Sequence, residues 1–257
     1  NRTPKPGPDH RAMRETLFIS DLHLAPERPR ITTLFLEFLR TRAARCDALY
    51  VLGDLFETWA GDDDLTPENR DILGALQRLT VTETPVYLMP GNRDFLMGAD
   101  LEALTGCRLI PDPTPLDLYG TRVLLLHGDA LCTDDEAYIA WRATVRNDRW
   151  IREFLVRPLE ERRALVRAAR AQSRAATGAK AGEIMDVTAG EVERAMRAHG
   201  VRTMIHGHTH RPGAHRFTLD GEPATRIVLG DWYREGHVLS AGAGSFTPEA
   251  LPLTEPA

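Results

Sequence analysis

This chain of 257 residues has few cysteines, no long apolar run and no excess of positive charge, and each of these features argues against a class of protein. It holds only three cysteines, Cys46, Cys107 and Cys132, none of them closely spaced, which argues against a disulfide framework and predicts a reducing, cytoplasmic location. It has no apolar run near the roughly 20 residues that a membrane-spanning helix needs, so we expect any membrane contact to be peripheral. It has no excess of positive charge, since the net charge of −5 gives no indication of a nucleic-acid partner.

What remains is the composition of a soluble globular protein, with 42% hydrophobic and 27% charged residues. The length fits one large domain, or one domain with a substantial insertion. We predict a disordered leader over residues 1–14, a core formed by 15–133 and 186–257, and a helical insertion, a lid, at 134–185. No obligate protein partner is predicted.

Short apolar runs rich in β-forming residues alternate with helical patterns. The runs that predict buried strands are 16–19, 48–52, 86–89, 123–126 and 201–205. Apolar spacing predicts helices over 31–42 and 67–79. This alternation is typical of βαβ units and a largely parallel sheet, and so of the α/β class. Later runs at 213–217, 224–229 and 237–239 predict further strands, spaced as an antiparallel meander.

Polar side chains that bind metals follow each of the five predicted strands. They are Asp21, His23, Asp54, Asn92, His127, His208 and His210. Ligands bind at the carboxyl ends of strands in open α/β sheets, so we expect these side chains to converge on one edge. Oxygen ligands suit hard divalent cations and imidazole suits first-row transition metals. The set therefore predicts a two-metal phosphoesterase centre.

The individual motifs differ in strength. Asp21-Leu22-His23 alone is usually a loop Asp beside a solvated His, and Asp54 after Gly53 alone is usually a helix N-cap. A single His such as His127 is more often a satisfied core histidine. Three imidazoles within five residues, at 206–210, are much harder to explain structurally. Only the whole set, in this order, indicates a metal centre.

These motifs resemble those of the calcineurin-like metallophosphoesterases, namely DxH, GD, GN(H/R), a single His and GHxH. The resemblance implies an αββα sandwich with the helical insertion added to it. It also implies one metal held by Asp21, His23, Asp54 and His210. The second metal would be held by Asp54, Asn92, His127 and His208. His206 matches no ligand position, and we expect it to support the ligands or the core.

Further motifs resemble those of the UDP-2,3-diacylglucosamine diphosphatase family. They are ISDLHL, VLGDLFETWAGDD, PGNRDFL, LLHGDALCTDD, RxxSxxxTxxK at 170–180, EIMDV at 183–187, IHGHTHRP and VLGDW. The resemblance implies two Mn²⁺ ions and water attack on the α-phosphorus of UDP-2,3-diacylglucosamine, giving 2,3-diacylglucosamine 1-phosphate and UMP for lipid A. It also implies action at the cytoplasmic face of the inner membrane. The substrate contacts it implies are Asn92, Arg93, Asp135, Ser173, Thr177, Lys180 and His208. Some relatives have Asn at the position of Thr177.

Arg93 stands where many members of the superfamily carry a His that protonates the leaving group. An arginine keeps its proton at any accessible pH and cannot act as a general acid, but it donates two hydrogen bonds to phosphate oxygens. A leaving group that needs no proton, such as a phosphate ester released from a diphosphate, suits this site. We therefore expect Arg93, with Asn92 and His127, to carry the catalysis.

The predicted insertion differs in charge from the rest of the chain. It holds 11 Lys or Arg and 8 Asp or Glu, so its charge is +3 and that of the remainder is −8. Apolar residues 150–151 and 154–156 lie among its arginines, a pattern that suits an anionic amphiphile or a membrane surface. The plainer alternative is a two-helix cap on its own core with solvated arginines. Aromatic residues proposed from chemistry alone to meet acyl chains are Trp59, Phe95, Tyr138 and Phe154.

Two other functions fit the same motifs. The first is a metallophosphoesterase for a soluble nucleotide diphosphate or a cyclic nucleotide, against which an apolar cleft under the insertion would argue. The second is a non-catalytic scaffold on the same fold, which the complete set of ligand positions disfavours.

Overall fold

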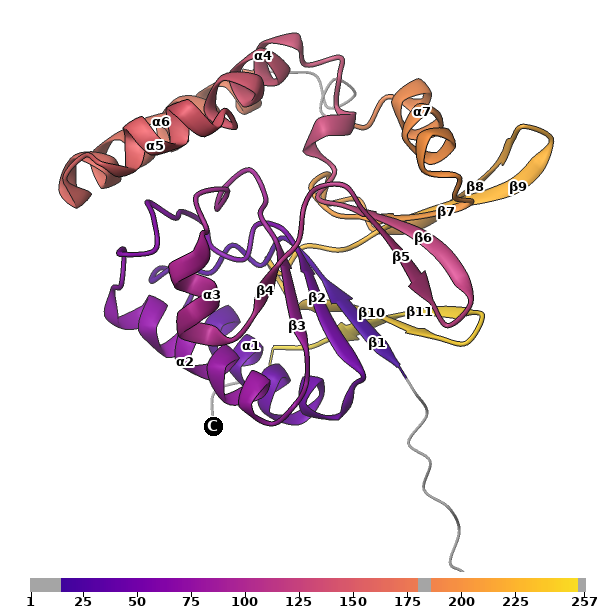
Figure 1. Ribbon diagram of the computed structural model, residues 1–257, viewed down its shortest axis with the longest axis horizontal. Coiled ribbons are helices and arrows are strands. Elements are labelled where there is room, and N and C mark those ends of the chain that lie inside the picture. Colours follow the sequence, from indigo (N-terminus) through magenta and orange to yellow (C-terminus); the bar gives the residue numbers. More distant parts are fainter. Residues whose placement is uncertain (1–14, 180–185, 254–257) are drawn as a thin grey trace, which may run out of the picture.

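The computed structural model describes residues 15–179 and 186–253, without the side chains of 174–179. In this part of the chain the strands form two sheets (Figure 1). The first has the order β11-β10-β1-β2-β3-β4. Its strands are β1 Thr16–Ile19, β2 Ala48–Leu52, β3 Val86–Met89, β4 Arg108–Leu109, β10 Gly236–Gly242 and β11 Ser245–Leu251. The second has the order β5-β6-β7-β9-β8. Its strands are β5 Thr114–Leu118, β6 Thr121–Leu126, β7 Thr203–His206, β8 Gly213–Leu219 and β9 Glu222–Val228.

Helices cover the outer face of each sheet. Beside the first sheet lie α1 Pro29–Thr41, α2 Pro67–Val81 and α3 Ala99–Thr105, and beside the second lies α7 Ala189–His199 (Figure 1). α2 begins at Pro67 as predicted, and Thr66 caps it by accepting a hydrogen bond from the Asn69 amide at 3.2 Å. α1 begins at Pro29, two residues before its predicted start, because Pro is favoured in the first turn of a helix.

Successive side chains along a strand point to opposite faces of its sheet and so enter different layers of the core. Leu17 and Ile19 of β1 pack with Phe35 of α1 in a cluster under the helices, whereas Phe18 joins a second cluster between the two sheets with Ile205 of β7. A third cluster packs the second sheet against α7. The molecule is thus an αββα sandwich, and the predicted fold class is confirmed.

The carboxyl-terminal strands correct one prediction. β8 and β9 pair antiparallel as expected, but β10 crosses to the first sheet and pairs antiparallel with β1, followed by β11. The predicted meander is therefore wrong. Alternating apolar residues identify a strand and its buried face, but they do not specify its partner, which depends on the free edge of β1.

The segment predicted to be a helical insertion contains α4 Glu136–Val145, α5 Asp148–Leu155 and α6 Leu159–Ala179. These helices lie across the top of the molecule, over the loops that leave β1, β2 and β3 (Figure 1). They are not a two-helix cap on its own core, because Phe154, with Trp150 and Val166 beside it, joins the cluster of the first sheet. Buried Arg162 also pairs with Asp63 of the sheet domain. Residues 1–14 lie outside the described part of the chain.

Candidate metal centre

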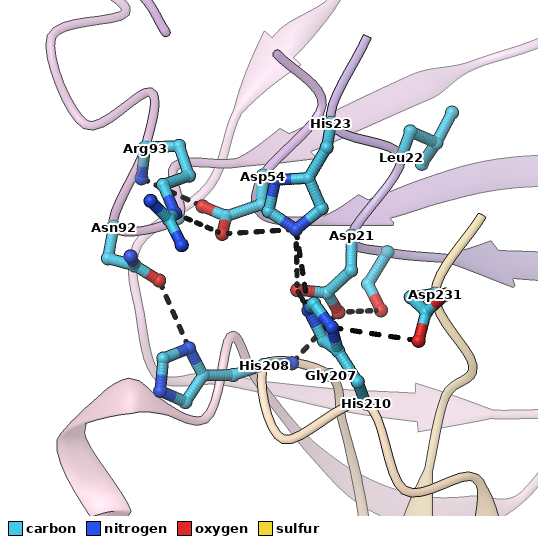
Figure 2. Close-up of polar contacts among 12 residues, drawn as sticks. Asp21, Leu22, His23, Asp54, Asn92, Arg93, Gly207, His208, His210 and Asp231 are labelled. Atoms are coloured by element: carbon cyan, nitrogen blue, oxygen red, sulfur yellow. Dashed lines mark hydrogen bonds and ion pairs between the residues drawn. The ribbon is translucent and has the colours of Figure 1, made fainter. Parts of the chain in front are cut away.

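The seven predicted ligands lie on loops that leave the carboxyl ends of five strands. Asp21 and His23 follow β1, Asp54 follows β2 and Asn92 follows β3. In the second sheet His127 follows β6, and His208 and His210 follow β7. Figure 2 shows six of these side chains pointing toward one another. The convergence expected from strand order is therefore present, although the roles of the residues as ligands stay a prediction.

Five of the seven have left-handed backbone conformations. The φ angles are 54° at Asp21, 49° at His23, 54° at Asp54, 69° at His208 and 54° at His210. Residues other than glycine rarely adopt this region, and each one costs about 1–3 kcal/mol. Such outliers persist where the surrounding structure holds them, and here they turn the side chains inward.

The first group consists of Asp21, His23 and His210. The Nε2 atoms of the two histidines lie 3.3 Å apart, and His210 Nε2 lies 3.3 Å from Asp21 Oδ1. Single ligand atoms of the three residues all fall within 4.8 Å of one another. Asp54 Oδ2 approaches His23 Nε2 at 3.8 Å and so borders this group.

The second group surrounds the Asn92 side chain. Its Oδ1 lies 2.9 Å from His127 Nε2 and 3.0 Å from His208 Nδ1, while Asp54 Oδ1 lies 3.7 Å from His127 Nε2. If the oxygen and nitrogen of the Asn92 side-chain amide were exchanged, the nitrogen would face the same two rings and lie 3.2 Å from Asp54 Oδ2. We adopt the inward oxygen, because that orientation presents a ligand atom toward the two rings. Asp54 thus borders both groups, as the sequence predicts for a shared ligand.

The electrostatics of both groups fit divalent cations. Asp21 Oδ1 is buried without a hydrogen-bond partner, an orphan that a cation would satisfy. Burial alone would lower the pKa of His127, but the charges of Asp54 and Asp21 outweigh it and raise the pKa to about 9. Burial lowers the pKa of His208 to about 4. An excess of buried carboxylate charge is thus balanced by a proton on His127 that a cation can replace.

Two glycines allow the close packing of these loops. A Cβ atom at Gly91 would lie 2.2 Å from Asp54 Oδ1, and one at Gly207 would lie 2.3 Å from Asp21 Oδ2. Real Cβ contacts are longer than this, so any other residue would displace a predicted ligand. The glycine before Asn92 and the glycine before His208 are therefore required by space.

Residues outside the predicted set hold the ligands in place. Buried Asp94 accepts hydrogen bonds from the backbone amides of Leu55 and Gly91, both at 2.7 Å, and so ties the loop of Asp54 to the loop of Asn92. Glu57 Oε2 lies 3.0 Å from His23 Nδ1. Neither Asp94 nor Glu57 is predicted from the sequence, although each lies inside one of the motifs given above, because only their neighbours match ligand positions.

Backbone and carboxylate groups orient the remaining imidazoles. His127 Nδ1 lies 2.9 Å from the Leu52 carbonyl, which leaves Nε2 facing the centre, and His210 Nδ1 lies 3.6 Å from Asp231 Oδ2. His206 is fully buried, with Nδ1 2.8 Å from the Gly207 carbonyl, and it faces away from the ligands toward Arg226. This is the supporting position expected of it.

The predicted substrate contacts fall into three classes. Arg93 lies at the centre, where its amide donates to Asp54 Oδ1 at 2.8 Å and its Nε lies 3.6 Å from Asp54 Oδ2. Asp135 caps α4 by accepting from the Tyr138 amide, and Ser173 is exposed on α6. Thr177 lies in α6, in the segment without described side chains, and Lys180 lies outside the described residues.

An aromatic cavity of about 370 Å³ opens beside Asn92 and Arg93. The aromatic residues that line it are Trp59, Phe95, Trp141, Trp150 and Phe154. Three of them, Trp141, Trp150 and Phe154, come from the insertion helices α4 and α5. The other two, Trp59 and Phe95, lie on loops that follow strands of the first sheet. Tyr138, which chemistry alone had suggested for this role, is not among the lining residues, because its hydroxyl donates to buried Asp129 at 2.5 Å instead.

The chain is similar to proteins of a known family over most of its length. The model of the family described as calcineurin-like phosphoesterase matches residues 15–212. The chain therefore belongs to the calcineurin-like phosphoesterase family. Membership implies a hydrolase with a divalent metal centre, and the groups described above can supply the ligands.

Curated relatives indicate a more specific group within the calcineurin-like phosphoesterase family. A protein named UDP-2,3-diacylglucosamine hydrolase from Pseudomonas aeruginosa is 53% identical, over 92% of this chain and 99% of that protein. Proteins of the same name from Stenotrophomonas maltophilia and Marinobacter nauticus are 49% and 52% identical, over 92% and 84% of this chain and 98% and 89% of theirs. Within the larger family, this chain groups with the relatives that carry that name.

Proposed function

We propose that the protein hydrolyses the diphosphate of UDP-2,3-diacylglucosamine to 2,3-diacylglucosamine 1-phosphate (lipid X) and UMP, in lipid A biosynthesis. The observation that carries this proposal is the aromatic cavity beside Asn92 and Arg93. A soluble nucleotide carries no apolar chains that would fill a chamber of this kind, whereas the two acyl chains of the proposed substrate would. The substrate in the name of the relatives, UDP-2,3-diacylglucosamine, has both a nucleotide and two acyl chains.

The centre would hold two Mn²⁺ ions. Asp21, His23 and His210 would hold one, and Asn92, His127 and His208 the other, with Asp54 shared between them. With its cations bound, the centre supplies charge to stabilise the phosphoryl oxygens and lowers the pKa of the water that attacks the α-phosphorus. Carboxylate, amide and imidazole donors together match the preferences of manganese.

The chain itself would orient the phosphates. The Arg93 guanidinium, tethered near Asp54, donates to the phosphoryl oxygens and balances the charge that grows on them. Asn92 and His127 fix the position of the reacting phosphate. The leaving group, a sugar phosphate, departs as a stable anion and therefore needs no proton from Arg93.

The insertion, residues 134–185, would act as a lid on the core formed by 15–133 and 186–257. The acyl chains would lie in the aromatic cavity, among Trp59, Phe95 and Phe154. Asp135, Ser173, Thr177, Lys180 and His208 would meet the glucosamine and its phosphate. Residues of α5 and of the middle of α6 line the cavity on one side and Trp59 and Phe95 line it on the other, so the chains would enter between these two helices and the loops of the first sheet.

The outer surface of the insertion suits contact with the lipid that supplies the substrate. Within the described residues, no helix is long and apolar enough to cross a membrane. Val156 is 83% exposed and Leu155 is 36% exposed, close along the chain to Arg152 and Arg157. Apolar side chains beside arginines favour peripheral binding to the anionic cytoplasmic face of the inner membrane. Neither nucleic acid nor an obligate protein partner is proposed.

The test is turnover of UDP-2,3-diacylglucosamine by the manganese-loaded protein in oxygen-18 water, followed by mass spectrometry. We expect one label in UMP and none in the lipid phosphate. Chelation should abolish turnover, and comparison of added Mn²⁺, Mg²⁺ and Zn²⁺ identifies the preferred ion. Label in the lipid phosphate would contradict attack on the α-phosphorus, and cleavage of a simple diester without cleavage of the lipid would contradict the substrate.

A further inference from the structure

One face of α4 contacts the three loops that supply the second group of predicted ligands. Tyr138, Arg142 and Arg146, which caps the end of the helix, are spaced four residues apart and so lie on the same side of it. Tyr138 packs against the His208 ring of the loop after β7, with 6.2 Å between centroids. Arg142 donates to Asp129 of the loop after β6 at 2.8 Å. Arg146 reaches the loop after β3, where it donates to a backbone carbonyl.

Arg146 contacts the loop after β3 on both sides of its two functional residues. Its Nη2 donates to the Gly91 carbonyl at 2.8 Å, and its guanidinium carbon lies 5.1 Å from the centre of the Phe95 ring. Between these two contacts lie Asn92 and Arg93, the predicted ligand and the predicted phosphate donor. The Arg146 side chain is only 21% exposed, so its hydrogen bond is partly shielded from water.

The hydrogen bond of Arg146 fixes the peptide that carries the Asn92 amide. Gly91 has no side chain to hold its backbone, and glycine has the largest conformational freedom. Its amide donates to Asp94 Oδ1 at 2.7 Å, and its carbonyl accepts from Arg146. That carbonyl belongs to the planar peptide that joins Gly91 to Asn92. A rotation of this plane would therefore move Asn92 Oδ1, which lies 3.0 Å from His208 Nδ1 (Figure 2).

We propose that Arg146 is a positioning residue of the metal centre, which acts through the Gly91 carbonyl to hold Asn92 where its amide oxygen binds the second cation. This inference rests on the proposed function, in which Asn92 is a ligand of that ion. It gives the insertion a part in forming the centre, separate from any contact with acyl chains.

The charge of Arg146 and its position predict opposite effects on cation binding. A positive charge near the centre repels Mn²⁺, so loss of the charge alone would strengthen binding. Asp129 Oδ2 lies 3.7 Å from Arg146 Nη2 and offsets part of that charge. Loss of the hydrogen bond to Gly91 releases the peptide before Asn92 and weakens binding. Because groups that orient ligands change metal affinity about 10- to 100-fold, we expect the loss of positioning to dominate.

The test is a titration of the metal-free full chain with Mn²⁺, in which the unbound ion is followed by electron paramagnetic resonance. The wild type should bind two ions. In Arg146→Ala the affinity for one ion should fall about tenfold while the affinity for the other stays unchanged. Arg146→Lys, which keeps the charge and a donor, should recover part of the loss. Arg149→Ala is the matched control, because it removes an exposed arginine that pairs with Glu153 of its own helix.

Hydrogen exchange follows the loop after β3 without metal or substrate. Arg146→Ala should speed amide exchange about fivefold in fragments that contain residues 90–95, where the Gly91 and Arg93 amides are hydrogen-bonded. Exchange over β7 should equal that of the wild type, whereas a general loss of structure would raise both. If Arg146→Ala does not fold, Arg146→Lys should show smaller changes in the same ion and the same fragments.

Three results would overturn the inference. They are unchanged or tighter binding of both ions, an equal loss of affinity for both ions, and wild-type exchange over residues 90–95. In each case the wild type still cleaves the substrate, and the proposed function stands. If the wild type binds two ions but does not cleave UDP-2,3-diacylglucosamine, the proposed substrate fails and the titration still decides the role of Arg146. If the wild type binds fewer than two ions, the proposed centre fails and the inference falls with it.

Discussion

The metal centre and the α4–α6 insertion are built by different physical means. The centre rests on side chains that are buried (Asp21, His23, Asp54 and His127) or half-buried, held by strained backbone and by loops that a single methyl group would disrupt. The insertion exposes much of its surface, including Trp141 and Val156, and it is attached by ion pairs such as Arg163 with Asp64. Phosphoryl transfer needs atoms fixed to within fractions of an ångström, whereas acyl chains need an adaptable apolar surface.

The two regions nevertheless touch at a few charged residues. Buried Asp129 accepts hydrogen bonds from Tyr138 and from Arg142, the latter at 2.8 Å, and so fastens α4 beside the centre. Glu57 contacts both His23 of the centre and Arg170 of α6. Substitutions in the centre should therefore have larger effects than substitutions in these links, and substitutions on the outer surface of the insertion should have the smallest.

Removal of the shared carboxylate should have the largest effect. Asp54→Asn should lower kcat on the order of 10³-fold, because both predicted groups of ligands lose the charge between them. Bound manganese, measured by mass spectrometry of the purified protein, should fall with it. Asp71→Asn, at an exposed carboxylate of α2, should leave both quantities unchanged. Full activity in Asp54→Asn would mean that the residue is not a ligand.

Loss of the group that orients His23 should have the next largest effect. Glu57→Gln should weaken manganese binding about 10- to 100-fold, as is usual for partners of a ligand histidine. The measurement is activity against free Mn²⁺ in buffered solutions, with saturating metal expected to restore most of kcat. Glu83→Gln, beyond the opposite end of the sheet, is the control. Equal metal affinities in the two variants would count against this role.

Cutting the Asp129 link should destabilise the protein without emptying the centre. Asp129→Asn should lower the free energy of unfolding by about 3 kcal/mol at pH 7, the low end for a buried pair, because Arg142 keeps some contact with water. Urea denaturation measures this loss. A proteolytic digest would show whether cleavage increases first in α4, as we expect if that helix is the element released.

The stability that the Asp129–Arg142 pair contributes should depend on pH in a direction set by the pKa of Asp129. Burial alone would raise the pKa of Asp129, but His127 and Arg142 outweigh it and hold the pKa below its usual range. A lowered pKa contributes stability that is fully present above about pH 4 and is lost as pH falls further. The difference between wild type and Asp129→Asn should therefore be constant from pH 5 to 7 and shrink below pH 4. A difference that grows in acid would contradict the assignment.

The smallest effect should come from the outer surface of the insertion. Val156→Asp should weaken binding to anionic lipid vesicles about fivefold, because an apolar contact is replaced by a repelled charge. Activity on a soluble short-chain substrate should not change. Val81→Asp, at a valine of α2 that is 76% exposed, is matched in chemistry and exposure. Equal vesicle binding by both variants would leave the insertion as a lid without a membrane role.

Local motifs in the sequence were sufficient to predict most of the fold near the centre. The runs at 16–19, 48–52 and 86–89 became strands with those bounds, because buried parallel strands are continuous apolar runs. The short β4, with an exposed arginine, and the edge strand β11 carry no such pattern and were missed. Their pairing is determined by the neighbouring strand rather than by their own residues.

The sequence by itself determined which side chains could bind cations and which strand ends carry them, because spacing along a strand and the chemistry of carboxylate and imidazole are local properties. Only the tertiary structure decided that Asp94 joins two loops, that Glu57 links His23 to Arg170, and that Arg146 of the insertion donates to the Gly91 carbonyl. Those facts depend on distances between residues far apart in the chain. Such distances arise from packing two sheets and three added helices together, which no short stretch of residues encodes.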